Sequence, residues 1–321
     1  MTTGTNTNRK ALLGTADPPL ILDIKGNSLD DGPGIRSVVF FKGCPLSCVW
    51  CHNPESKKRG PEISFSPDDC VGCNACMDAC PAGALSGENP FYIDRKKCDL
   101  CFRCIPACPS GALEQVGREM TEKGILDRVI RDKVFFDASG GGVTFSGGEP
   151  TLHMPFLSGL IQSAAGAGLH TLLETCGLFD REAFDTLVLP HIHTVYFDIK
   201  IVDAALHRQY CGAANRKILE NFRHLAALAA EGRLDLLPRV PLVPGITATE
   251  ANLSAIAALL LENNIPFVKL LAYNPLWTQK PLKIGVKDKF SSEKASQDWI
   301  PSQDLDRMER IFRKKGIEIT D

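Results

Sequence analysis

Eight cysteines between residues 60 and 117 stand in two copies of one pattern, and this repeat restricts the possible folds more than any other feature. The run from Cys70 to Pro81 recurs 28 residues later, from Cys98 to Pro109. Cysteine, proline and glycine dominate the block, and no helical period survives in it. We therefore predict that residues 60–117 form an inserted module with two pseudo-twofold halves.

Each copy reads C-x2-C-x2-C-x3-C-P, the run of bacterial ferredoxins, in which three cysteines hold one [4Fe-4S] cluster and the fourth binds the other cluster. A pair of zinc sites is the alternative, but zinc sites favour two C-x2-C pairs over four closely spaced thiolates followed by proline. The repeat therefore predicts two [4Fe-4S] clusters, one on Cys70, Cys73, Cys76 and Cys108, the other on Cys98, Cys101, Cys104 and Cys80.

The composition is that of a globular, cytoplasmic protein. The chain has 321 residues, of which 44% are hydrophobic, so it can bury a sizeable core. Its 36 basic and 38 acidic residues leave a net charge of −2. The net charge therefore does not favour binding to nucleic acid or to an anionic membrane. Neither a signal peptide nor an uncharged apolar run of about 18 residues is present. In a reducing cytoplasm, thirteen cysteines indicate metal ligation rather than disulfides.

Outside the module, short apolar runs alternate with helical patterns. We predict strands at residues 37–41, 143–146, 170–175, 194–199, 236–243 and 267–272. Helices are predicted near residues 120–136, 155–168, 181–189, 216–231, 249–263 and 303–315. This alternation is typical of a parallel sheet with right-handed crossovers. Because six β/α units are fewer than the eight of a closed TIM barrel, we predict an open, partial (β/α)6 TIM-like barrel with ligands at the C-terminal strand ends.

These patterns divide the chain. Residues 1–19 are predicted to be a flexible tail, residues 20–59 and 118–321 the α/β partial barrel, and residues 60–117 the ferredoxin-like insertion. The polar stretch 279–302 has no period and is predicted to be a long loop.

A second group of cysteines follows the first predicted strand. Cys44, Cys48 and Cys51 have C-x3-C-x2-C spacing with no fourth cysteine nearby. A cubane held by these three thiolates keeps one iron without a protein ligand, and that iron can bind substrate. Three structural thiols are the alternative, but Pro45 and the loop-like residues Cys51 to Glu55 indicate a turn rather than a strand interior.

At this point the sequence resembles the radical S-adenosylmethionine (SAM) superfamily. The motifs Asp31-Gly-Pro-Gly-Ile-Arg36, Gly43 to Glu55 and Ser146-Gly-Gly-Glu-Pro150 look like those of the activating enzymes of glycyl-radical enzymes. The insertion is similar to the subgroup that serves lyases and dehydratases other than pyruvate formate-lyase. This resemblance implies three [4Fe-4S] clusters and SAM as cofactors. It also implies reductive cleavage of SAM, a 5′-deoxyadenosyl radical that removes hydrogen from a backbone glycine of the partner, and a flavodoxin or ferredoxin as electron donor.

The resemblance also implies roles for residues at the ends of the predicted strands. Lys200 is implied in catalysis with the three cysteines. The residues implied to bind SAM are Trp50, Gly147, Gly148, Glu149, Glu174, Asp198 and Arg239. Strand alternation sends Asp198 and Lys200 to the same side. For these motif residues a strand-end turn or a surface ion pair is the structural alternative.

The chain departs from the family pattern at two positions. Glu174-Thr-Cys-Gly177 stands where Asp-Thr-Asn-Gly is expected, and Asn274 stands where a histidine is expected, so it cannot titrate. Cys176 and Cys211 have no cysteine partner at cluster spacing and are predicted to be buried, inert thiols. The seven histidines form no metal motif.

Two other functions fit parts of this pattern. An electron-transfer protein would use all its clusters to store and pass electrons, but the three-cysteine site argues against it. A radical SAM enzyme acting on a small molecule or peptide usually carries its auxiliary clusters after the barrel, whereas here they interrupt it. The order of motifs therefore favours an activating enzyme.

Overall fold

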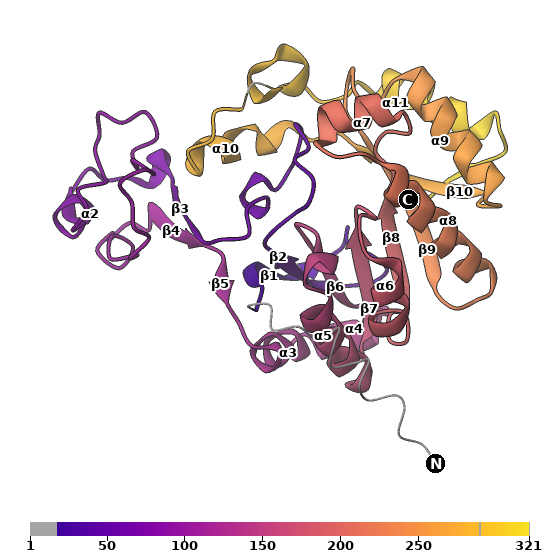
Figure 1. The fold of residues 1–321 in the computed structure, drawn as a ribbon, viewed down its shortest axis with the longest axis horizontal. Helices are drawn as coiled ribbons and strands as arrows, with labels where there is room; N and C mark the ends of the chain where they lie inside the picture. The colour runs from indigo at the N-terminus through magenta and orange to yellow at the C-terminus, as the bar shows by residue number, and fades with distance from the viewer. Residues whose placement is uncertain (1–17, 289, 321) are drawn as a thin grey trace.

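The computed structural model describes residues 18–288 and 290–320, so most of the predicted tail 1–19 lies outside the described residues. Its centre is a nine-stranded sheet with the strand order β11-β10-β9-β8-β7-β6-β2-β1-β5 (Figure 1). The strands from β11 to β2 are parallel to their neighbours, whereas β1 and β5 are antiparallel to theirs. The chain is therefore an α/β protein. Closure of this sheet into a partial barrel remains a prediction.

The six predicted strands are confirmed, each within one residue at either end. They are β2 (Arg36–Phe41), β6 (Gly142–Gly147), β7 (His170–Thr175), β8 (Thr194–Asp198), β9 (Asp235–Leu242) and β10 (Phe267–Ala272). Most of their residues are buried on both faces, which is why they appear in the sequence as continuous apolar runs. The sequence analysis missed three strands at the ends of the sheet: β1 (Leu20–Ser28), β5 (Arg118–Glu119) and β11 (Glu318–Thr320).

Helices follow most of the parallel strands. The helices predicted from the sequence differ from the structure in two places. The single helix predicted at residues 120–136 is two helices, because the chain turns at Asp132 and the carboxylate there accepts a hydrogen bond of 2.6 Å from Ser37 Oγ. A further helix after β8 was not predicted. The helices are α3 (Glu122–Ile130), α4 (Lys133–Ser139), α5 (Met154–Gly166), α6 (Arg181–Leu187), α7 (Ala204–Cys211), α8 (Arg216–Ala230), α9 (Glu250–Glu262) and α11 (Ser302–Arg313).

The stretch 279–302, predicted to be a loop, contains helical turns. The short helix α10 (Lys280–Lys283) follows a 3-10 turn at Pro275–Gln279, and further 3-10 turns come later. Buried hydrogen bonds fix this segment, since Trp277 Nε1 donates to Tyr273 Oη at 2.8 Å and Tyr273 Oη donates to Ser296 O at 2.8 Å. We call residues 275–300 the strap.

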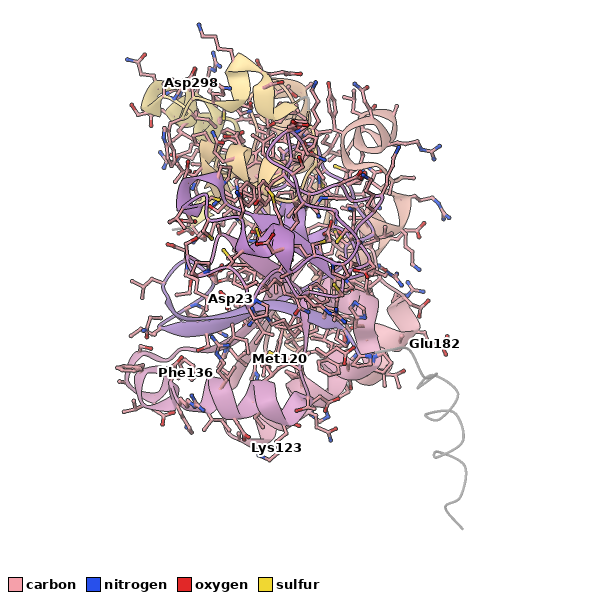
Figure 2. The ribbon with its side chains drawn as sticks, turned by 90° about the vertical axis from the view of Figure 1, so that its left-hand side faces the viewer. Asp23, Met120, Lys123, Phe136, Glu182 and Asp298 are labelled. Carbon is pink, nitrogen blue, oxygen red and sulfur yellow. The ribbon has the colours of Figure 1, made fainter. Side chains whose placement is uncertain are left out.

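A cysteine-rich lobe, residues 62–116, stands apart from the large sheet at the left of Figure 1. Its ends pair as an antiparallel ribbon of β3 (Glu62–Phe65) and β4 (Leu113–Val116), and it contains the short helix α2 (Ala75–Asp78). It has a small apolar core of its own, formed by Ile63, Cys76, Leu85, Ile93, Cys104 and Leu113. Figure 2, seen from the side of the lobe, shows sulfur atoms gathered near its middle.

The sequence repeat of the lobe is also a repeat of backbone conformation. Left-handed residues recur at the repeat spacing, with φ of 70° at Gly72 and 58° at Leu100, and 62° at Asn74 and 58° at Phe102. Side chains other than glycine seldom adopt this conformation, so its recurrence shows that both halves need the same chain path. Alternating left- and right-handed residues turn successive N–H groups inward, which makes concavities that bind anions, including Fe–S clusters.

A buried ion pair joins the lobe to the sheet. Lys42, directly after β2, is fully buried and its Nζ lies 2.8 Å from Glu62 Oε2. Lys58 Nζ lies 2.7 Å from the other oxygen, but its side chain is 61% exposed. Burial would raise the pKa of Glu62, yet the two lysines outweigh it and hold this pKa below its ordinary value. The pair therefore stays charged near neutral pH.

Replacing the buried lysine should destabilise the protein much more than replacing the exposed one. Lys42→Met leaves Glu62 buried beside a single, solvated cation, and we expect a loss of about 3–5 kcal/mol. Lys58→Met removes a contact with the same carboxylate at the surface and should cost less than about 1 kcal/mol. Anaerobic urea unfolding of both variants measures the difference. Equal effects would show that Lys42 does not hold the lobe to the sheet.

Candidate active site

A cavity of about 390 Å³ opens at the C-terminal ends of the parallel strands. Cys44, Cys48 and Cys51 line it, together with Trp50 from the same loop. The other predicted site residues on its walls are Gly147, Gly148, Glu174, Asp198, Lys200 and Arg239. The structure thus brings together, from the ends of four strands and the loop after β2, all but one of the residues predicted for this site.

Two glycines let the loop of the three cysteines lie against the sheet. At Gly147, φ is 102°, and a Cβ there would clash with the backbone of Phe41. A Cβ at Gly148 would clash with the carbonyl of Gly43, the residue before Cys44. Glycine is therefore required at both positions for this close backbone approach.

The loop is also held from the opposite side by the end of α7. Ser47 N donates to Cys211 O at 2.8 Å, and Val49 N donates to Tyr210 O at 3.0 Å. Within the loop, Cys51 N donates to Cys48 O at 3.2 Å. The three thiols are thus fixed by backbone contacts on two sides.

Cys176 and Cys211, predicted to be inert, are buried and lie beside the three cysteines. Cys211 forms a side-chain hydrogen bond with Cys48, and this bond is the largest cause that lowers the pKa of Cys48 to about 7. Cys176 forms one with Cys44, which raises the pKa of Cys176 well above its ordinary value. Burial raises the pKa of Cys51 to about 12. The sequence gave no sign of these contacts, because they join segments far apart in the chain.

Four charged side chains of the cavity wall form one network. Arg239 donates to Asp198 Oδ1 through Nε at 2.9 Å, and through NH1 to Glu174. Lys200 Nζ lies 3.1 Å from Asp198 Oδ2. Ser146 Oγ donates to the second oxygen of Glu174 at 2.6 Å. Two acids and two bases therefore balance within the cavity wall.

This network stays ionised because its members stabilise one another. Burial would raise the pKa of Asp198, but Arg239 and Lys200 outweigh it and hold this pKa below its ordinary value. Burial would likewise lower the pKa of Arg239 and Lys200, yet the charge of Asp198 raises both above their usual range. The pairs are therefore fixed charges at any pH near neutrality.

Glu149 is the predicted site residue that the structure does not bring to the cavity wall. Its fully buried carboxylate accepts hydrogen bonds from Thr151 Oγ1 at 2.6 Å, Thr175 Oγ1 at 2.9 Å and the backbone N–H of Cys176 at 2.7 Å. The side chain therefore joins the end of β6 to the end of β7. The sequence could not show this orientation, since a strand-end turn leaves the direction of the side chain open.

The cavity wall contains further polar groups that the sequence analysis did not propose. Asp30 and Asp31, between β1 and β2, lie at its edge. His52 lines it too; this residue is exposed, and partial desolvation, aided by Lys280, lowers its pKa. Asn274 also faces the cavity, and its Oδ1 accepts a hydrogen bond of 2.9 Å from Leu276 N. Asn274 thus caps the first turn of the strap.

The eight cysteines of the lobe fall into two groups in space. Cys70, Cys73, Cys76 and Cys108 line one small cavity beside Tyr92. In the other group, burial raises the pKa of Cys104 to about 11, and Cys98, Cys80 and Cys101 are close enough to raise it further. Among residues 18–288 and 290–320, no three His, Cys, Asp or Glu side chains are placed to hold a single metal ion. A cubane needs wider spacing, since each thiolate binds a different iron.

The similarity of this sequence to characterised proteins decides the family. It is 36% identical over 304 residues to the trans-4-hydroxy-L-proline dehydratase activating enzyme of Clostridioides difficile, covering 93% of this chain and 97% of that protein. It is 40% identical over 268 residues to the isethionate sulfite-lyase activating enzyme of Nitratidesulfovibrio vulgaris, covering 81% and 86%. The chain belongs to the activating enzymes of glycyl-radical enzymes. It is a radical SAM oxidoreductase, and the predicted activity is confirmed.

Two further comparisons agree with this family. The model of a 4Fe-4S single cluster domain matches residues 30–182 of the activating enzyme, a range that includes the loop of the three cysteines and the whole lobe. A radical SAM methyltransferase from Sphaerobacter thermophilus superposes with a TM-score of 0.50 over 99% of this chain and 81% of the other. At 14% identity this likeness concerns the fold alone. No helix in the described ranges is long and apolar enough to cross a membrane.

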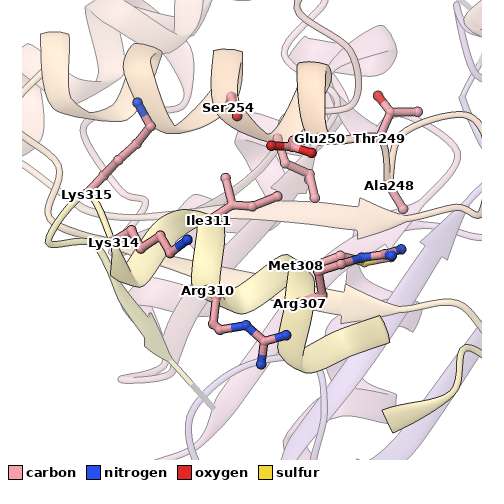
Figure 3. A pocket seen from close by; sticks show the side chains of 11 residues that line it. Ala248, Thr249, Glu250, Ser254, Arg307, Met308, Arg310, Ile311, Lys314 and Lys315 are labelled. Atoms are coloured by element: carbon pink, nitrogen blue, oxygen red, sulfur yellow. The ribbon is translucent and has the colours of Figure 1, made fainter. Parts of the chain in front are cut away.

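A larger cavity of the activating enzyme, about 570 Å³, lies between α9 and α11 (Figure 3). Of its basic side chains, Arg307 lies at the middle of α11, Arg310 lies in its last turn, and Lys314 and Lys315 follow the helix. Cations at this end of a helix complement its dipole. None of the predicted site residues lines this cavity, so volume alone does not locate the chemistry.

The buried carboxylate of Glu149 provides a test of how the cavity is built. In Glu149→Gln, an amide N–H₂ group replaces one carboxylate oxygen. This group is itself a donor and cannot accept the hydrogen bonds that the oxygen accepts. We therefore expect the unfolding free energy to fall by about 1–3 kcal/mol. Glu220→Gln is the control, because that side chain pairs with Arg216 at the surface and should change stability by less than about 0.5 kcal/mol. Anaerobic urea unfolding measures both. Equal stabilities would contradict a structural role for Glu149.

Proposed function

We propose that Cys44, Cys48 and Cys51 hold the [4Fe-4S] cluster that cleaves SAM in this activating enzyme. The observation that carries the proposal is their position on one cavity wall, with four fixed charges on the facing strand ends. A cluster bound by three cysteines keeps one iron open, and when bound it supplies the electron for cleavage of the carbon–sulfur bond of SAM.

A fourth thiol lines the same cavity, but its position does not suit a ligand. Cys176 follows β7 and lies outside the C-x3-C-x2-C loop that supplies the three proposed ligands. Its N–H is also fixed by Glu149 at the end of β7. We therefore assign Cys176 to the wall of the site and not to the cluster.

The remaining side chains bind and orient SAM, whose methionine part carries an amino and a carboxylate group. Arg239 offers a guanidinium suited to a carboxylate, and Glu174 and Asp198 offer oxygen acceptors to an amino group. Lys200, paired with Asp198, stands beside the cysteines and adds a positive charge. Gly147 and Gly148 present bare backbone to the cavity, and Glu149 fixes that backbone from behind. Trp50, buried in the same loop, excludes water.

We also propose that the lobe is a ferredoxin-like domain, residues 60–117, with two further clusters on the cysteine groups Cys70, Cys73, Cys76, Cys108 and Cys98, Cys101, Cys104, Cys80. The grouping of the thiols and the repeated left-handed residues support this proposal. Three clusters in all would then serve one chain, and residues 20–59 and 118–321 would form the partial barrel around the SAM site.

The partner is a glycyl-radical enzyme, and the proposed electron donor is a flavodoxin or ferredoxin in a reducing cytoplasm. No disulfide joins any of the thirteen cysteines, in keeping with such a compartment. Relatives are named for partners as unlike as choline trimethylamine-lyase and benzylsuccinate synthase, so the class of partner is shared and its substrate is not. The small molecule on which the partner acts is therefore determined by the partner and not by the activating enzyme.

The cluster assignment predicts a sharp difference between two buried cysteines of the cavity. Cys48→Ala should abolish formation of 5′-deoxyadenosine from SAM under dithionite and lower the iron content from about twelve to about eight atoms per chain. Cys176→Ala should keep both the iron and the cleavage of SAM. Iron analysis and chromatography of the nucleoside products check this. Cleavage that survives in Cys48→Ala, or iron lost in Cys176→Ala, would overturn the assignment.

A further inference from the structure

Lys57 bridges the first two cysteines of the proposed SAM site. Its carbonyl accepts a hydrogen bond of 3.1 Å from the N–H of Cys44, and its Nζ donates to the carbonyl of Cys48 at 2.8 Å. The side chain is half-buried. One residue outside the cysteine motif thus places a positive charge against the loop that carries the thiols.

Three other lysines around this loop are neutralised by nearby carboxylates. Lys42 pairs with Glu62, Lys200 with Asp198, and Lys280 with Glu55 at 3.4 Å. Within residues 18–288 and 290–320, Lys57 has no carboxylate within 4.0 Å, and its ammonium contacts a neutral carbonyl instead. The charge of Lys57 therefore acts on its surroundings without a paired negative charge to cancel it.

A charge at this place matters because the first step of the activation is a reduction. A low-potential, one-electron donor gives one electron to a [4Fe-4S] cluster in its 2+ state, which becomes 1+, and no bond or proton changes. Nearby charge and solvent exposure set the potential of such clusters. A cation close to the added negative charge favours the reduced state, and partial burial weakens the screening by solvent.

We propose that Lys57 is a positioning residue that makes the cluster on Cys44, Cys48 and Cys51 easier to reduce. This inference rests on the proposed SAM site. The next residue offers a matched comparison, since Lys58 points to Glu62 on the lobe and is largely exposed. Two neighbouring lysines of equal charge therefore have different expected effects on the same cluster.

The test is a redox titration of the anaerobic holoenzyme, followed by electron paramagnetic resonance. The signal that changes when SAM is added identifies the cluster at the open site. At a fixed ambient potential, Lys57→Met and Lys57→Gln should each lower the ratio of reduced to oxidised cluster on the order of tenfold, a shift of about 59 mV to more negative values. Lys57→Arg and Lys58→Met should both stay close to the parent enzyme.

The set of variants separates charge from anchoring of the loop. Glutamine keeps a hydrogen-bond donor without the charge, so a normal potential in Lys57→Gln would overturn the proposal. If Lys57→Met fails to hold iron, Lys57→Gln and Lys57→Arg still decide the matter. Should no signal of the parent enzyme respond to SAM, the proposed SAM site itself would be wrong, which is a different outcome from an unchanged potential in the variants.

Discussion

The close approach of two chain segments at the C-terminal edge of the sheet is the constraint on which the site depends. The end of β6 lies directly on the residues that follow β2, and hydrogen bonds from Gly148 N to Phe41 O and from Glu149 N to Gly43 O, each 2.8 Å long, join them. No side chain fits between these backbones. The loop of the three cysteines is therefore pressed against the strand ends, where the charged side chains of β7, β8 and β9 already face inward.

A second property of the site follows from its balance of charge. Glu174, Asp198, Lys200 and Arg239 pair with one another, so this part of the cavity wall offers directed donors and acceptors whose formal charges sum to zero. A ligand such as SAM, with an amino group, a carboxylate and a sulfonium, suits a wall of that kind. Lys57, a cation without a carboxylate partner in the described part of the chain, is not among the residues that line the cavity, and its ammonium donates to the carbonyl of Cys48.

Much of this arrangement could be predicted from the sequence, for physical reasons that also explain the misses. Parallel strands buried on both faces give continuous apolar runs, which located β2 and β6 to β10, and cysteine spacing located both kinds of cysteine site. The half-exposed β1 and the short β11 lack such runs. Cys176 and Asp31 reach the cavity, and Cys211 reaches Cys48, through the tertiary fold alone. The direction of the Glu149 side chain depends on donors at the end of β7 that no local sequence pattern shows.

The small core of the lobe has a consequence for the stability of this part of the protein. Two of its six buried side chains, Cys76 and Cys104, are proposed cluster ligands, and few apolar groups remain to hold the lobe together without them. The large sheet has an extensive core of its own. If the proposed clusters are bound there, the stability of the lobe would depend on them more than the stability of the large sheet does.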